Sequence, residues 1–330
     1  MRNVFIASGS AGLLFVIGAS AIAYAQQKPA LPDNYPRKAI RIVVASAAGG
    51  GTDFAARLIG TSLSERWGIP VVIDNRTGAS GAIAVDVVAK ANPDGYTLLM
   101  TPKSAIIAVA LINKVAYDTR RDLVPISMIS AQPYVLVTTA SLPSNSVKEL
   151  IGYAKSKPNA LSYASAGVGA DGHLTMELFK SMAGVSMEHV SFNGTGPGMI
   201  ALLGGHIQLL FGTTLSVSPH AKSGRIKMLA VTSLKRTPLL PDVATVSESG
   251  LSGFESIGWT GFLGTAGTPS AIVSALDREI SQILKLSIVQ DKFLAGGGET
   301  AHVSPAAFRE IIAKEFDKTA RLVKELNLGQ

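Results

Sequence analysis

The 330-residue sequence contains no cysteine. Disulfides, thiol nucleophiles and thiolate metal sites are therefore excluded, and a chain of this length can be stable on the packing of its core alone. Charged residues are also scarce, at 16%, and aromatic residues make up only 6%. No basic run is interleaved with aromatics, so we expect no nucleic acid among the partners.

Small and aliphatic residues are abundant instead. Hydrophobic residues make up 47% of the chain, and its 33 glycines and 16 prolines are spread along it. This composition suits parallel strands that are buried on both faces and joined by tight turns. The length fits two domains of ordinary size better than one.

Residues 1–25 have the pattern of a cleavable signal peptide. Arg2 is followed by a short apolar stretch and by Ala23-Tyr24-Ala25, the small-x-small pattern that precedes signal cleavage. The stretch is shorter than the roughly 20 apolar residues of a membrane span, and no basic stop-transfer cluster follows it. We expect cleavage after Ala25 and export to the periplasm.

The mature chain alternates between strand and helix patterns, which predicts an α/β fold. In the first half, strands are expected at 40–45, 70–74 and 97–101, with helices at 54–67 and 82–91. After Pro143, helices are expected at 147–155, 174–183 and 198–203, with strands at 161–165, 189–192, 207–211 and 226–232. Two long amphipathic helices, 271–286 and 305–326, end the chain.

Two apolar segments, 135–139 and 257–263, lie at the two ends of the second α/β unit. If both cross between lobes, the second lobe is inserted into the first on a two-strand hinge, which allows closure around a ligand. The expected limits are 36–136 plus 258–330 for lobe 1 and 137–257 for lobe 2. The alternative, two domains on one linker, lacks a Ser/Pro-rich linker.

Glycines 49–51 form a turn between a predicted strand and a predicted helix. Glycine allows close backbone approach to a ligand, and the free N–H groups and positive dipole end of the helix favour an anion such as a carboxylate. Thr52 or Asp53 is expected to cap this helix. The Lys-Ser/Thr ending of a P-loop is missing, which argues against nucleotide phosphates. A plain turn without a ligand is the alternative.

Residues 165–172 (SAGVGADG) form a second glycine-rich turn before a helix and match G-x-G-x-x-G. A dinucleotide site is disfavoured because the next strand ends at Phe192-Asn193, with no acidic residue for a ribose, and because the leader directs export. We interpret this turn as the partner of the first, with two helix N-termini facing one cleft. Asp171 is expected to cap its helix.

The sequence predicts neither catalysis nor a metal or other cofactor. The five histidines form no HExxH or other close metal pattern, and there is no GxSxG motif. Ser165, Asp171 and His173 could be imagined as a triad, but nothing in the spacing supports it. An exported hydrolase remains the alternative, although it needs a nucleophile–base pair that the sequence does not reveal.

Motifs along nearly the whole mature chain resemble the Bug/TctC-type periplasmic receptors of tripartite tricarboxylate transporters. They are, in order, YPxKxIR (35–41), GGGTD with Ala56-Arg57, PVVxxNR (70–76), VAKAxPDGYTLL (88–99), Tyr117-Asp118, Glu149-Leu150, YxSxGxG (163–169), His173-Leu174, His189-Val190, LAVTS (229–233), Pro241-Asp242-Val243, Trp259 and AGTP (266–269).

The resemblance implies the type II periplasmic-binding-protein fold, in which two Rossmann-like lobes on a two-strand hinge close like a Venus flytrap. It implies a monomer that binds a small carboxylate, largely through backbone N–H groups and waters, and delivers it to the large and small membrane subunits of a transporter. Presentation of the ligand to a membrane sensor kinase is the alternative partner.

The residues expected to contact the ligand come from the two turns and the neighbouring strand ends. They are Ser46, Ala47, Gly50, Gly51, Thr52, Asp53, Lys103, Ser104, Ser165, Gly167, Gly169, Ala170, Asp171, Asn193, Gly194 and Gly212. Three of them depart from the family's usual pattern. Ser46 replaces an aromatic, Asn193 lies in a segment that replaces HVPY and a basic residue, and Gly212 replaces an Asp. These changes suggest a larger pocket and a ligand without an ammonium group.

Overall fold

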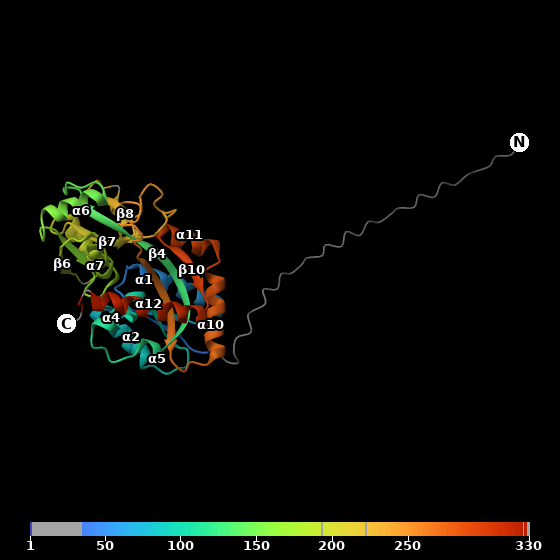
Figure 1. Cartoon of the computed structure of the whole chain (residues 1–330). Helices are drawn as coiled ribbons and strands as arrows, with labels where there is room; N and C mark the ends of the chain where they lie inside the picture. The colour runs from blue at the N-terminus through green and yellow to red at the C-terminus, as the bar shows by residue number, and fades with distance from the viewer. Residues whose placement is uncertain (2–34, 193, 222, 326, 329–330) are drawn as a thin grey trace. The chain divides into compact units, whose positions relative to one another are not determined.

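The computed structural model describes residue 1 and residues 35–192, 194–221, 223–325 and 327–328. All the strands and helices belong to one compact unit, Leu31–Gln330, in which they alternate as the α/β prediction requires (Figure 1). The predicted leader, apart from Met1, lies outside the described residues, so its cleavage stays a prediction.

The first part of the sheet is built around a parallel core. Strand β1 (Ile40–Val44) pairs in parallel with β2 (Val71–Asn75) on one side and with β3 (Thr97–Pro102) on the other, and β9 (Ile257–Thr265) lies antiparallel to β3. Ile42 and Val44 of β1 enter the core under α1 (Gly51–Trp67) and α10 (Ser270–Ile283). Val43 faces the opposite core under α2 (Ala82–Ala89) and α12 (Pro305–Glu325). Burial on both faces explains the unbroken apolar strand sequences.

Strand β4 (Leu123–Thr139) runs through both parts of the sheet (Figure 1). Its residues up to Pro133 pair with β9, whereas those from Tyr134 onward pair with β7 (Leu209–Thr213) and, from Val135, with β8 (Ile226–Val231). The change of partner lies close to the predicted lobe limit at residue 136. The exact lobe limits remain a prediction.

The second part of the sheet repeats the parallel arrangement. Strand β5 (Ser162–Ser165) pairs in parallel with β6 (Glu188–Ser191) and β7. Helices α6 (Val147–Ser156) and α7 (Asp171–Ala183) cover one face, and α8 (Thr195–Leu203) and α9 (Thr214–Ala221) cover the other. The two parts therefore form two α/β lobes, as the sequence predicts.

The remaining elements are short or close the structure at its C-terminal end. They are η1 (Ala79–Gly81), α3 (Lys103–Ile106), α4 (Ala108–Ile112), α5 (Thr119–Asp122), α11 (Ser287–Ala295) and β10 (Glu299–Val303). The sequence analysis did not predict η1, α3, α4, α5, α9, α11 or β10. Among the residues described, no helix has the length and apolar character needed to cross a bilayer.

Candidate functional site

The predicted ligand loops follow the carboxyl ends of parallel strands. The first follows β1 and leads into α1, and the second follows β5 and leads into α7. In open α/β sheets, ligands bind at this edge, because the strand ends and helix N-termini leave a crevice there.

The first loop ends at Gly50, which is the N-cap of α1 and makes no side-chain cap hydrogen bond. Gly49 takes the left-handed conformation (φ 82°), and Ala47, Ala48 and Gly49 are exposed. Thr52 and Asp53 are buried inside the first helical turn, so the prediction that one of them is the N-cap is wrong. The helix already starts at Gly51, so its N-cap is Gly50, which has no side chain that could cap the N-terminus.

Asp53 holds the first loop in shape. Its Oδ2 accepts hydrogen bonds from Gly49 N (2.8 Å) and Arg57 Nε (3.0 Å), and its Oδ1 accepts one from Asn75 Nδ2 (3.0 Å). Burial alone would raise the pKa of Asp53, but the hydrogen bonds of Arg57 and Gly49 outweigh it and hold the pKa below its usual value. Asn75 also donates to the Ser46 carbonyl (3.1 Å), which ties β2 to the loop.

The η1 turn connects the two loops. A Cβ at Gly81 would lie 2.7 Å from Ala105 Cβ and 3.2 Å from the Ala45 carbonyl, so this turn packs tightly at the end of β1. On its other side, Ser80 Oγ donates to the Val168 carbonyl of the second loop (3.3 Å). The first loop, η1 and the second loop thus lie together at one edge of the sheet.

The second loop is built on two glycines with positive φ, Gly167 (124°) and Gly169 (80°). A Cβ at Gly169 would lie 3.2 Å from Ile112 Cδ1 of α4, so the loop contacts the first lobe closely. Ala170 is the N-cap of α7 and makes no side-chain cap hydrogen bond. The prediction that Asp171 caps this helix is wrong, because Asp171 is the first helical residue.

The structure reveals a serine–histidine contact that the sequence analysis missed. Ser165 Oγ lies 2.7 Å from His189 Nε2 of β6, 3.0 Å from the Gly167 carbonyl and 3.1 Å from Gly167 N. The hydroxyl is thus engaged by its own loop in a buried position. Within the described residues no carboxylate is hydrogen-bonded to His189, so the third group of a catalytic triad is missing. The contact follows from the pairing of β5 with β6, which sets Ser165 opposite Ser191, two residues from His189, and no local sequence signal specifies that pairing.

Lys103, Ser104 and Asp171 meet at the hinge. Lys103 Nζ donates to the Ile257 carbonyl (2.5 Å) and lies 3.4 Å from Glu315 Oε2 of α12. Burial raises the pKa of Asp171, while the charge of Lys103 and the neighbouring Ser104 hydroxyl act in the opposite direction. Lys103 and Asp171 line a cavity of about 420 Å³ between α7 and α12. In this conformation the Lys103 ammonium is occupied by protein groups.

The remaining predicted ligand residues differ in how closely they are packed. A Cβ at Gly212 would lie 2.9 Å from Ser216 Oγ and 3.0 Å from Val217 Cγ2, so the lost side chain leaves no open volume there. Ser46 is half-buried, and the three residues that follow it in the first loop are exposed. Gly194 precedes α8 with φ 119°, and Asn193 lies outside the described residues.

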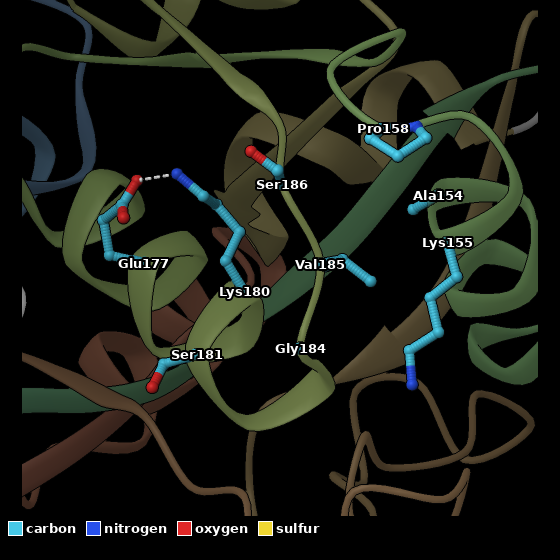
Figure 2. Close-up of a pocket in the computed structure, with 9 residues that line it drawn as sticks. All are labelled: Ala154, Lys155, Pro158, Glu177, Lys180, Ser181, Gly184, Val185 and Ser186. Atoms are coloured by element: carbon cyan, nitrogen blue, oxygen red, sulfur yellow. Dashed lines mark hydrogen bonds and ion pairs between the residues drawn. The ribbon is translucent and has the colours of Figure 1, made fainter.

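A second hollow, of about 490 Å³, lies between α6 and the C-terminal end of α7. Figure 2 shows Lys180 reaching Glu177 at this hollow, while Lys155 points away from them. It lies at the end of α7 opposite the second loop. In the part of the chain that the structure describes, no group of three His, Asp or Glu residues is placed to hold a metal ion.

The comparisons with known proteins agree with this geometry. The model of the tripartite tricarboxylate transporter family receptor matches residues 55–328. Protein BugT of Bordetella pertussis is 35% identical over 315 residues, which cover 95% of this chain and 97% of BugT.

Two solved structures are similar over nearly their whole length. R. palustris Rpa4515, solved with adipate, is 34% identical with a TM-score of 0.85 and covers 89% of this chain and 99% of its own. MatC from Rhodopseudomonas palustris, solved with bound malate, is 30% identical with a TM-score of 0.82 and covers 88% and 100%. With its two lobes and its glycine-rich loops at the sheet edge, the chain belongs to the receptor family of the tripartite tricarboxylate transporters.

Proposed function

We propose that this receptor captures a small carboxylate between its lobes in the periplasm and passes it to the two membrane subunits of a tripartite transporter. The observation that carries the proposal is the pair of helix N-termini, of α1 and α7, that lack side-chain caps and follow glycine-rich loops at the same sheet edge.

A carboxylate suits these ends for two reasons. Each N-terminus offers backbone N–H groups and the positive end of a helix dipole, and charge-assisted hydrogen bonds to carboxylates are stronger than neutral ones. The chain also carries a net charge of +7, or +6 without Arg2 of the leader, which favours the approach of an anion.

The ligands of related structures and the packing around the predicted loop residues narrow the class of ligand. The related structures hold adipate and malate, two dicarboxylates without an ammonium group. We propose that this receptor also takes a dicarboxylate or a similar acid, and that the small side chain of Ser46 accommodates a bulky part of it. Because Gly212 is closely packed, it contributes no extra room.

Two measurements test the function. In calorimetry with adipate, malate, aspartate and glutamate, we expect binding of at least one of the two acids that lack an amino group. Binding of aspartate or glutamate without binding of adipate or malate would contradict the proposed ligand class. After expression with its leader, intact-mass analysis should show a chain that begins at Gln26.

Delivery is tested by capture from membranes. The ligand-loaded receptor should retain the large and small transporter subunits, and the empty receptor should retain less. Capture of a membrane kinase in their place would overturn the transporter assignment and favour a sensory role. Turnover of a bound ester or amide that is lost in Ser165→Ala would instead favour the hydrolase.

A further inference from the structure

The second glycine loop is held in place by two histidines that the proposed function does not use: His173, which is buried, and His189, which is half-buried. Gly169 N donates to His173 Nδ1 of α7 (3.3 Å), and Gly167 is bound to the Ser165 hydroxyl, which in turn contacts His189 Nε2 (2.7 Å). The two rings lie 4.4 Å apart, and His189 stacks on Tyr163 at 4.9 Å. The loop is therefore tied at both of its positive-φ glycines.

Hydrogen-bond accounting assigns the protons on these rings. A hydroxyl offers one donor and two acceptor sites, and Ser165 Oγ has three partners. Its contacts with the Gly167 carbonyl and Gly167 N use the donor and one acceptor site. With the hydroxyl donating to the Gly167 carbonyl, the remaining site is an acceptor, and this arrangement assigns a proton to His189 Nε2.

The opposite holds for His173. A backbone N–H only donates, so Nδ1 of His173 must be bare to accept from Gly169. Burial, with His189 acting in the same sense, lowers the pKa of His173 to about 4. The ring therefore stays neutral at ordinary pH, with its proton on Nε2.

We propose that His173 and His189 are positioning residues for the ligand loop, one as an obligatory acceptor for Gly169 and the other as an obligatory donor to Ser165. Gly167 and Gly169 adopt positive φ values, and glycine has many other allowed backbone conformations. The loop therefore needs these hydrogen bonds to keep the N-terminus of α7 directed at the ligand. The inference rests on the proposed function only for its effect on affinity.

The Tyr163 ring, on which His189 stacks, is held in place by the ion pair of Glu177 and Lys180. Tyr163 donates to Glu177, which also accepts from Lys180 at 2.6 Å, and His189 stacks on the Tyr163 ring (Figure 2 shows the Glu177–Lys180 pair). Among the described residues no carboxylate is hydrogen-bonded to either imidazole, and the hydrogen bonds described above connect both histidines to the loop.

The protonation state of the histidine ring nitrogens in the ligand-free protein provides a direct test. Nitrogen-15 NMR of histidine-labelled receptor at pH 7 should show a bare Nδ1 at His173 and a protonated Nε2 at His189. A protonated Nδ1 at His173, or a bare Nε2 at His189, would overturn the assignment whether or not any carboxylate binds.

Paired variants separate positioning from packing. His173→Asn keeps an acceptor near the Nδ1 position, whereas His173→Leu keeps the bulk and removes the acceptor. We expect hydrogen exchange of amides 167–169 to be at least about fivefold faster in His173→Leu, since a buried donor loses its partner. The affinity of His173→Leu for adipate or malate should also fall. In His173→Asn, both the exchange rate and the affinity should return towards those of the wild type.

If the ring only fills space, His173→Leu would instead be tolerated better than His173→Asn, and the inference would be wrong. His206→Asn, at an exposed histidine after α8, is the matched control and should change neither readout. Should His173→Leu fail to fold, Ser165→Ala takes its place and should speed exchange at Gly167. Absence of binding by the wild type would contradict the proposed function alone, because the exchange result stands without a ligand.

Discussion

Replacing Gly50 by aspartate should weaken ligand binding strongly while leaving the fold intact. Gly50 is the N-cap of α1, with φ −81° and ψ 167°, and a Cβ there would lie 3.4 Å from its nearest neighbour, the Ala47 carbonyl. Any L-residue fits this conformation, and aspartate is a preferred N-cap. We therefore expect a change in the free energy of unfolding of no more than about 1 kcal/mol.

The effect on binding should be much larger. A carboxylate at this N-cap occupies the N–H groups meant for the ligand and repels it. Two unit charges 4 Å apart repel by about 1 kcal/mol in water and about 4 kcal/mol near a protein surface, equivalent to a loss of affinity between about fivefold and about a thousandfold. Raising the salt concentration should shrink the loss, because exposed charges are screened.

Two controls isolate the cause. Gly50→Asn caps the same N–H groups without a charge, so the difference between the two variants measures repulsion. Gly152→Asp places the same charge on the exposed face of α6, where a Cβ meets no other atom, and should leave affinity unchanged. Calorimetry with adipate and malate measures all three. Wild-type affinity in a folded Gly50→Asp protein would refute the role of the first loop.

Three further predictions concern stability and the hinge. Lys103→Ala should lower the free energy of unfolding in urea by about 1–3 kcal/mol, because the Ile257 carbonyl and Glu315 lose a charged partner; unchanged ligand affinity in this variant would exclude a ligand contact for Lys103. Burial lowers the pKa of His173 from 6.5 to about 4 in the folded protein. As the pH falls from 6.5 towards 4, His173 is therefore protonated in the unfolded chain before it is protonated in the folded one, and the free energy of unfolding falls by up to about 3 kcal/mol. Urea titrations of wild type and His173→Asn should diverge over that range, and parallel curves would contradict the assignment. Gly212→Ala should destabilise by about 1–3 kcal/mol through overpacking, and an unchanged melting temperature would show that the space is open.

Local patterns were sufficient to predict most of the fold. The strands under α1 and α7 were evident because short apolar runs ended in glycine-rich turns, and both glycine loops were found for the same reason. Strand β4 was harder, since Pro125 and Pro133 interrupt its pattern. Each proline removes a ladder donor, and only the antiparallel partner β9, far along the chain, shows that the strand continues.

The site was predicted at the level of loops but not of side-chain contacts. Polar residues at helix starts are usually caps, so Asp53 and Asp171 were interpreted as caps, whereas the structure uses them inside the first helical turns. The tie between Ser165 and His189 depends on the pairing of β5 with β6, which no local pattern specifies. The same holds for Lys103, whose partners lie on β9 and α12.

A crystal structure with adipate or malate bound tests the central claim most directly. The ligand should lie at the carboxyl edge of the sheet, with its carboxylate oxygens within about 2.7–3.2 Å, directly or through one water, of backbone N–H groups from both the 49–52 and the 167–171 segments. A ligand found in the cavity between α7 and α12 beside Lys103, or contacting only one of the two loops, would contradict the account.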